Sequence, residues 1–386
     1  MSGGEGGIAS SPSLNTSAQR ANINNSREIN LATNYYFHGF DIKNFRTFDA
    51  LSVKNLKRIN IIGGLNGAGK TTLLETLFCA LDLRDPISLI KPYQWRQIYM
   101  QGEKDLDLIF REATRASTLS FLTRDGTFLH ELNKKQIPPQ AISVMSSGNS
   151  SSGQREQYNF TTDIGLHSKI SHNGESLMDK YTLPHSYGYV GSLNMQKNIP
   201  VASCQILTAS LRSNPIDIAN RYSASVRSGM KSQVLEALRL LDSSIDELVL
   251  LQEGNQPNVY AERGGGLIAI NLLGEGLRTL LDAVLAVSNA TNGVVLFDEI
   301  DTPLHYSVTA KIWGILAIIA NKVNCQIFAT SHSREAILSA AAGIHSSGHE
   351  KDFRYMRIEK SNASHKAICY DYVELESADE FGFEFR

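Results

Sequence analysis

Residues 64 to 72, with the sequence GLNGAGKTT, have the composition and spacing of a phosphate-binding turn. Two glycines lie five positions apart, a lysine and two threonines follow, and an apolar run from Ile59 to Ile62 precedes them. A glycine-rich turn between a strand and a helix lets backbone N–H groups converge on phosphate oxygens. The residues expected to bind phosphate are Gly64, Asn66, Gly67, Ala68, Gly69, Lys70, Thr71 and Thr72.

Two carboxylates at the end of a second apolar run complete this chemistry. The run from Val294 to Phe297 is typical of a strand buried on both faces, and Asp298 and Glu299 follow it directly. Ligands of α/β sheets bind at the carboxyl ends of the strands. We expect Lys70 to reach the β- and γ-phosphates of a nucleoside triphosphate, and Thr71 and Asp298 to ligate Mg²⁺. Glu299 is expected to polarise the attacking water.

A histidine follows a third apolar strand. The segment IFATSHS places His332 34 residues after Asp298, with one predicted helix between them. We expect His332 to contact the γ-phosphate or the attacking water, and the alternative is a structural histidine. The scattered His167, His172 and His185 lack the spacing of metal ligands and are interpreted as loop residues.

Apolar periodicity predicts the elements that position these side chains. Residues 35–64 predict two or three strands, and residues 70–83 predict a helix. Residues 212–250 predict a helix, a turn and a strand. The remaining expectations are a loop, a helix and a buried strand over 264–299, a helix over 307–323, a strand ending at TSH, a helix from 333, and a strand pair over 353–375.

We divide the chain into four segments. Residues 1–34, rich in Gly, Ser and Asn, predict a disordered tail. Residues 35–83 carry the phosphate-binding turn, and residues 235–386 carry the two carboxylates and His332. Residues 84–234 are predicted to be a helical or irregular middle segment that acts as a lid or binds a partner, and its stretch SVMSSGNSSSGQREQYNF predicts a mobile loop.

Composition restricts the class of protein. The formal net charge is -2 and the pI is about 6.6, so nucleic-acid binding would need a local basic patch. No apolar run approaches the roughly 20 residues that span a bilayer, and the N-terminus lacks the pattern of a signal peptide. The cysteines are far apart and are expected to be reduced. They are Cys79, Cys204, Cys325 and Cys369. We expect a cytoplasmic protein that does not enter a membrane.

The motifs together resemble the ABC-type ATPase head of the RecF/SMC/Rad50 group. Within that group the chain is similar to the stand-alone AAA15/AAA21 ATPases, the OLD-like, RloA-like and PARIS-ATPase-like proteins. The resemblance covers about residues 37–80 and 235–386 and is carried by IKNFRTF, the phosphate loop, LLGEGLRTLLDAV, DEID, TSH and the ending DYVELESADEFGFEFR. It implies an α/β fold, with a mixed or parallel sheet core, antiparallel N-terminal strands and the helical or irregular middle segment.

The resemblance implies a site shared between two subunits. In such proteins two heads meet head to tail, and each ATP lies between one subunit's phosphate loop and the other's signature segment. By this resemblance, Gly274, Glu275 and Gly276 open the helix that faces the partner's γ-phosphate, where free N–H groups and the helix dipole favour an anion. Arg46, the arginine of the NFR segment, would lie near the nucleotide.

Some family features are missing or unplaced. Leu273 stands where many ABC heads have a signature serine. Asp301 or His305 could serve the subunit interface, and Asp301 is the preferred candidate. The glutamine of the Q-loop is unassigned, with Gln94 and Gln205 among the candidates.

The leading hypothesis is an ATP-binding and hydrolysing switch or sensor subunit of a bacterial antiphage defence system. It would use ATP and Mg²⁺, form a homo-oligomer and control a separate effector protein, such as a Toprim-like protein, a nuclease or another toxin. The alternative is a RecF/SMC-like DNA-binding ATPase of repair or genome maintenance. Its basic surface would have to come from KNLKR (54–58) or RSGMK (227–231), each of which is also typical of a solvated face. A transporter subunit or a scaffold with structural ATP fits the motifs less well.

Overall fold

The computed structural model describes most of the chain from Asn34 onward. Residues from Tyr35 to the C-terminus form one compact unit. The predicted tail up to residue 33 and the predicted mobile loop lie outside the described residues. The structure describes residues 34–386 except 86, 101, 113, 139–163, 184–188, 196–198, 209–213, 255, 300–305, 362–363, 383 and 385–386.

A six-stranded sheet forms the core and confirms the predicted α/β fold class. Its strand order is β16-β15-β3-β14-β13-β9. Five strands are parallel, and β16 joins antiparallel at one edge. The bounds are β3 (Ile59–Gly63), β9 (Cys204–Leu207), β13 (Val294–Phe297), β14 (Gln326–Thr330), β15 (Phe353–Ser361) and β16 (Ser364–Tyr370).

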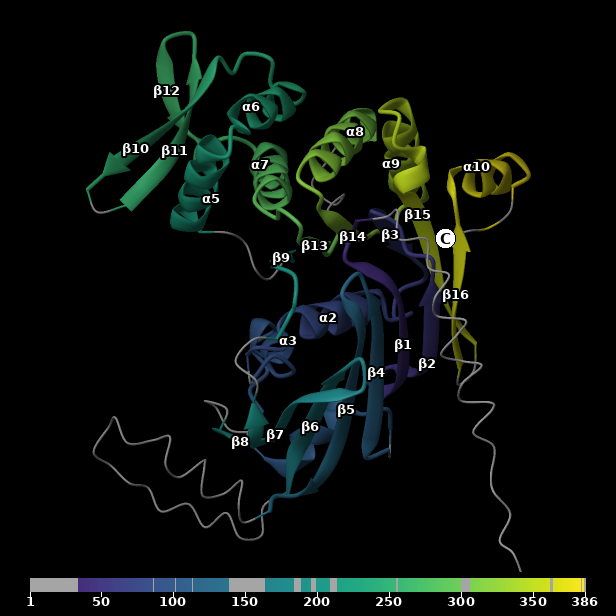
Figure 1. The fold of residues 1–386 in the computed structure, drawn as a ribbon. Coiled ribbons are helices and arrows are strands. Elements are labelled where there is room, and N and C mark those ends of the chain that lie inside the picture. The colour runs from purple at the N-terminus through teal and green to yellow at the C-terminus, as the bar shows by residue number, and fades with distance from the viewer. Residues whose placement is uncertain are drawn as a thin grey trace, which may run out of the picture. The chain divides into compact units, whose positions relative to one another are not determined.

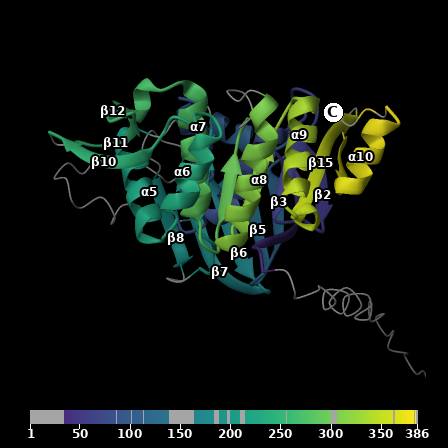
Figure 2. The same cartoon turned by 90° about the horizontal axis from the view of Figure 1, so that it is seen from above.

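Both faces of this sheet are buried, which explains its continuous apolar strands. Helices α7 (Glu275–Ser288), α8 (Tyr306–Lys322) and α9 (Arg334–Ser346) lie side by side on one face, and α2 (Lys70–Leu81) lies on the other (Figures 1 and 2). Along β13, Val295 and Phe297 pack with the α7–α9 layer, whereas Val294 and Leu296 pack with α2. Alternate residues of one strand therefore hold the two layers together.

The middle segment differs from the helical or irregular region that we expected. Five of its strands continue the sheet begun by the N-terminal hairpin, and the antiparallel order is β2-β1-β4-β5-β6-β7-β8. The β6–β7 turn contains Asn173 and Gly174, whose φ angles of 52° and 87° suit a tight hairpin. The bounds are β1 (Phe37–Phe45), β2 (Phe48–Lys54), β4 (Ala116–Thr123), β5 (Gly126–Gln136), β6 (Ile164–His172), β7 (Glu175–Leu183) and β8 (Tyr189–Met195).

The region between β9 and β13 contains more helices and strands than predicted. The predicted single helix after residue 212 is two helices, and the loop expected from residue 264 contains a strand, because β10, β11 and β12 form a separate antiparallel sheet. The elements are α5 (Pro215–Arg227), α6 (Lys231–Arg239), β10 (Glu247–Glu253), β11 (Gln256–Arg263), β12 (Gly266–Ala269) and η3 (Ile270–Leu272). Two further elements, α3 (Lys91–Trp95) and η1 (Glu103–Ile109), precede β4.

The predicted C-terminal strand pair ends earlier than expected. Residues 372–375 belong to helix α10 (Tyr372–Glu380) and not to a strand. The Asp371 side chain accepts a hydrogen bond from Glu374 N at 2.9 Å, and Glu374 accepts one from Asp371 N at 2.8 Å. This reciprocal capping box satisfies two donors at the start of the helix, which favours a helix at this position.

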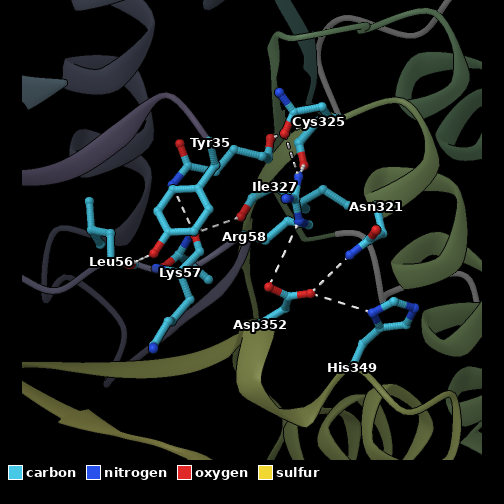
Figure 3. A network of polar contacts seen from close by, with 12 residues as sticks. Tyr35, Leu56, Lys57, Arg58, Asn321, Cys325, Ile327, His349 and Asp352 are labelled. Carbon is cyan, nitrogen blue, oxygen red and sulfur yellow. Dashed lines mark hydrogen bonds and ion pairs between the residues drawn. The ribbon is translucent and has the colours of Figure 1, made fainter. Parts of the chain in front are cut away.

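A polar network ties the amino ends of β3 and β14 to the short helix η4 (Glu350–Asp352) (Figure 3). Arg58 Nη1 donates to Asn324 Oδ1 at 3.0 Å, and Arg58 Nε lies 3.9 Å from Asp352 Oδ1. Asp352 also accepts a hydrogen bond from Asn321 at 3.2 Å. These contacts fix the sheet at the edge opposite to the strand ends that carry the motifs.

Two expectations from composition can be compared with the structure. The four cysteines are free thiols, and burial raises the pKa of Cys79 to about 12. Within the described ranges, no helix is long and apolar enough to cross a membrane.

A lysine is buried between the antiparallel sheet and the end of α2. Lys180, on β7, is 1% exposed, and its Nζ donates to the Asp85 carbonyl at 3.4 Å. Burial lowers its pKa to about 8, since the interior disfavours the ammonium. The folded chain therefore tolerates this charge at a cost in stability.

We predict that Lys180→Met raises the free energy of unfolding at pH 7 by about 2–3 kcal/mol. Between pH 8 and 10.5, the unfolded chain retains a proton that the folded chain releases, so wild-type stability rises with pH. The difference in the free energy of unfolding between Lys180→Met and wild type should therefore decrease between pH 8 and pH 10.5. Urea unfolding at pH 7 and pH 10 measures it, with the exposed Lys169→Met as the control. Equal gains at both pH values would contradict the prediction.

Candidate functional site

The phosphate loop connects β3 to α2 as predicted. Gly64, Gly67 and Gly69 have φ angles of 132°, 78° and 100°, a region that favours glycine. A Cβ on Gly64 would lie 2.4 Å from the Ile358 carbonyl oxygen, and a Cβ on Gly69 would lie 2.8 Å from the Phe48 ring. The loop is thus held between β15 and β2, while Asn66 and Gly67 at its crest are exposed.

Lys70 lies folded over the loop. Its Nζ donates to the Gly64 carbonyl at 2.7 Å and to the Leu65 carbonyl at 3.3 Å. It begins α2, with Gly69 as the N-cap residue, so the lysine and the free N–H groups of the helix share one end. This arrangement presents positive charge where an anion would bind.

The structure brings the two predicted Mg²⁺ ligands together. Thr71 Oγ1 lies 3.2 Å and 3.3 Å from the two carboxylate oxygens of Asp298. Thr71 lies at the start of α2, after β3, and Asp298 follows β13. These two strands are separated by β14, whose last residue Thr330 completes the contact. Thr330 Oγ1 donates to Asp298 Oδ1 at 2.7 Å and accepts a hydrogen bond from Glu299 N at 2.9 Å. Thr330 was not predicted, although it is a polar residue at a strand's carboxyl end.

These residues fit a magnesium ion. A hydroxyl and a carboxylate supply two hard oxygen ligands, and Mg²⁺ is usually bound by one or two protein oxygens together with water and substrate phosphates. Within the described part of the chain, no group of three or more His, Cys, Asp or Glu side chains could hold a metal by itself. The site therefore suits an ion that is shared with a phosphate ligand.

Glu299 and His332 follow neighbouring strands. Both side chains are exposed at the carboxyl edge of the core sheet, where β13 and β14 end. Glu299 has a φ of 56°, an uncommon conformation for a residue with a side chain. Such strained backbone is concentrated at functional sites, where the surrounding structure imposes it. The backbone bond to Thr330 is one such restraint.

The structure places Arg46 in a buried cluster beside α2. The Arg46 side chain is 7% exposed, and its Nη1 donates to Glu75 Oε2. It lies over the Tyr93 ring at 4.5 Å. Arg96 Nη2 binds the other oxygen of the same carboxylate at 2.5 Å. Burial raises the pKa of Glu75, and both arginines oppose that rise. Proximity of Arg46 to a nucleotide stays a prediction, and its contacts with Glu75 and Tyr93 were not predicted.

The predicted signature residues lie on another element. Gly274 is the N-cap residue of α7, and Glu275 and Gly276 form its first turn. This helix packs against α5, α6 and α8, whereas the phosphate loop packs against β2 and β15. Gly274 and Glu275 are exposed, so this helix end is open for a contact with another molecule.

The remaining candidates are placed only in part. Asp301 and His305 lie outside the described residues. Gln205 pairs with Val295 within β9, two positions before the end of that strand, and Gln94 belongs to α3. Thr208 follows β9 directly, at the edge where β13 ends. The structure therefore places Gln205 inside its strand and not at the carboxyl edge itself.

Comparison with known proteins assigns the chain to a family. A family model described as an AAA domain matches residues 40–176, and another, described as "AAA domain, putative AbiEii toxin, Type IV TA system", matches residues 260–339. An uncharacterized protein of Methanocaldococcus jannaschii is 30% identical over 169 residues, which cover 40% of this chain and 76% of that protein. The chain belongs to the P-loop ATPases with AAA domains. This ATPase also has features of the AbiEii-like AAA domain.

The chain is also similar to other proteins, at lower sequence identity. An "ATP/GTP phosphatase" of Helicobacter pylori is 23% identical over 334 residues, which cover 77% of this chain and 85% of that protein. An SMC head bound to the C-winged helix domain of ScpA is 11% identical, with a TM-score of 0.49 over 90% of this chain and 99% of that one. The SMC head domain from Thermotoga maritima is also 11% identical, with a TM-score of 0.41 over 87% of this chain and 99% of that one.

We predict that Thr330→Val lowers the rate of ATP turnover about tenfold. The charged carboxylate of Asp298 loses the hydrogen bond that Thr330 donates to it, and Glu299 N loses its acceptor. Thr330→Ser keeps the hydroxyl and should turn over ATP at close to the wild-type rate. Phosphate release under saturating Mg-ATP measures both. If the valine variant turns over ATP as fast as wild type, Thr330 does not contribute to the site.

Proposed function

We propose that this ATPase binds and hydrolyses Mg-ATP, and that ATP controls the association of two copies of the head. The contact between Thr71 and Asp298, completed by Thr330, carries the proposal. This contact brings the end of the phosphate loop beside the carboxylate that follows β13. A P-loop ATPase needs its phosphate-binding residues and its Mg²⁺-binding carboxylate at one place.

The chain's own residues have distinct tasks in the proposed reaction. Lys70 and the N–H groups of the phosphate loop bind the β- and γ-phosphates, and Thr71 and Asp298 hold the Mg²⁺. That ion would neutralise charge that develops on the phosphates. Glu299 accepts a proton from the attacking water while the bond between the γ-phosphorus and the bridging oxygen breaks. His332, at the end of β14, hydrogen-bonds the γ-phosphate or that water.

The second part of the site comes from another copy of the chain. Gly274, Glu275 and Gly276 are the residues that we assign to the γ-phosphate of the partner's ATP. Their helix end is exposed, which supports such a contact. ATP then favours the associated form because that form binds it on both sides, and hydrolysis removes the preference.

We further propose that this switch is the sensor of a bacterial antiphage defence system that controls a separate effector protein. The family description that names a putative AbiEii toxin and a type IV toxin–antitoxin system supports a link to toxic effectors. The effector would be a Toprim-like protein, a nuclease or another toxin. The cytoplasm, where such effectors act, is the proposed location.

The alternative, an SMC-like ATPase that binds DNA, needs a free basic surface. In the first basic cluster, Arg58 is turned inward and donates to Asn324 and to the Cys325 carbonyl. In the second, Lys231 pairs with Glu247 at 2.5 Å. Arg58 and Lys231 are therefore paired within the protein, which reduces the positive charge that these two clusters could offer to DNA.

We predict that Lys70→Ala abolishes ATP binding, since the variant lacks the cation that faces the β- and γ-phosphates. The exposed Lys54→Ala serves as the control and should bind like wild type. Isothermal titration with Mg-ATP measures both affinities. Unchanged affinity in Lys70→Ala would show that the phosphate loop does not bind the nucleotide.

We predict that Glu299→Gln binds ATP but turns it over at least about 100-fold more slowly, because the amide cannot accept the proton. The variant should therefore accumulate the ATP-bound dimer. Light scattering with and without Mg-ATP measures its mass. A monomer in both conditions contradicts ATP-driven association, and an unchanged oligomer shows that assembly precedes ATP.

A further inference from the structure

Glu75 is a buried carboxylate shared by two arginines of different exposure. It belongs to α2, and its side chain is 5% exposed. Arg46 binds Oε2 and is almost as buried, whereas Arg96 binds Oε1 and is 41% exposed. Either arginine alone could keep the carboxylate paired. An unpaired carboxylate at this burial would be strongly unfavourable.

Arg46 is incompletely satisfied where it lies. Its Nε and Nη2 are buried without a hydrogen-bond partner among the described residues. The backbone of Arg46 has a φ of 51°, in the left-handed region that residues with a long side chain seldom adopt. Buried guanidinium donors normally find acceptors, and exceptions require an explanation. Arg46 thus has two donors to offer to an acceptor that the described residues do not supply.

The turn that carries Arg46 lies directly against the phosphate loop. Thr47 Oγ1 is 3.0 Å from the position that a Cβ on Gly69 would occupy, and this hydroxyl is also buried without a partner. On the other side, Glu75 is one helical turn beyond Thr71, and the charge of Asp298 contributes to the raised pKa of Glu75. The cluster therefore borders both the loop and the Mg²⁺ ligands.

We propose that Glu75 and Arg96 are positioning residues that exchange partners when a nucleoside triphosphate binds: Arg46 leaves Glu75 for the phosphates, and Arg96 alone keeps Glu75 paired. The inference rests on the proposed function, because it requires ATP at the phosphate loop. A phosphate group supplies several acceptor oxygens and satisfies the donors of Arg46 that lack partners here. Arg96 makes the exchange feasible, because without it the departure of Arg46 would leave the carboxylate bare.

The exchange has a distinctive signature in ATP affinity. Arg96→Ala leaves Arg46 as the sole partner of Glu75, so Arg46 is retained and ATP binding weakens about tenfold, the equivalent of one charge-assisted hydrogen bond. In the Glu75→Gln background the neutral amide no longer retains Arg46, and Arg96→Ala should then have no effect on ATP affinity. Arg96→Lys keeps a cation at Glu75 and should restore binding.

The experiment is a double-mutant cycle on ATP affinity, with melting temperatures of every variant as the control for folding. Weakening by Arg96→Ala that disappears in the Glu75→Gln background, with rescue by Arg96→Lys, supports the exchange. Wild-type affinity in Arg96→Ala, or equal weakening in both backgrounds, overturns it. These results stand apart from the proposed function, which fails if wild type does not bind ATP or if Lys70→Ala binds it equally well.

Discussion

The parallel alignment of β3, β14 and β13 is the constraint on which the candidate site depends. Ile59 pairs with Ile327, and Ile327 pairs with Val295, so the three strands end at one edge. Apolar residues pack on both faces, and a shift by one residue would exchange the two packed faces. The positions of Thr71 and Asp298 are therefore set by the hydrophobic packing of the core strands that precede them.

The sequence predicts those parts of the fold and site whose pattern is local. The strand, loop and helix around Lys70 are contiguous, and Asp298 follows directly on its own strand. The network around Arg46 is different, because Glu75 and Arg96 belong to no motif and meet only through the tertiary fold. Thr330 could have been found by asking which polar side chains end a strand.

The middle segment shows why strands are harder to predict than motifs. β1 pairs with β4, and Ile42 opposes Leu119 across a long stretch of chain, so the register depends on residues that no short window contains. Half of each strand is polar, and the central strands therefore lack a long apolar run. Asn173 and Gly174 are a local hairpin signal, and the neighbouring His172, which we interpreted as a loop residue, is the last residue of β6. The capping box at Asp371 is a comparable local signal at the start of α10.

The strand that ends at the Arg46 turn is also a member of the seven-stranded sheet. β1 is bonded to β2 on one side and to β4 on the other, and the same sheet continues to β8. Hydrogen-bonded strands resist sliding, so a rotation of the turn is shared by the strands beside it. A displacement of the Arg46 turn would therefore be transmitted through the hydrogen bonds of this sheet to the strands of the middle segment. The stiffness of the sheet, and not a series of side-chain rearrangements, would determine how far a conformational change at the nucleotide extends into the protein.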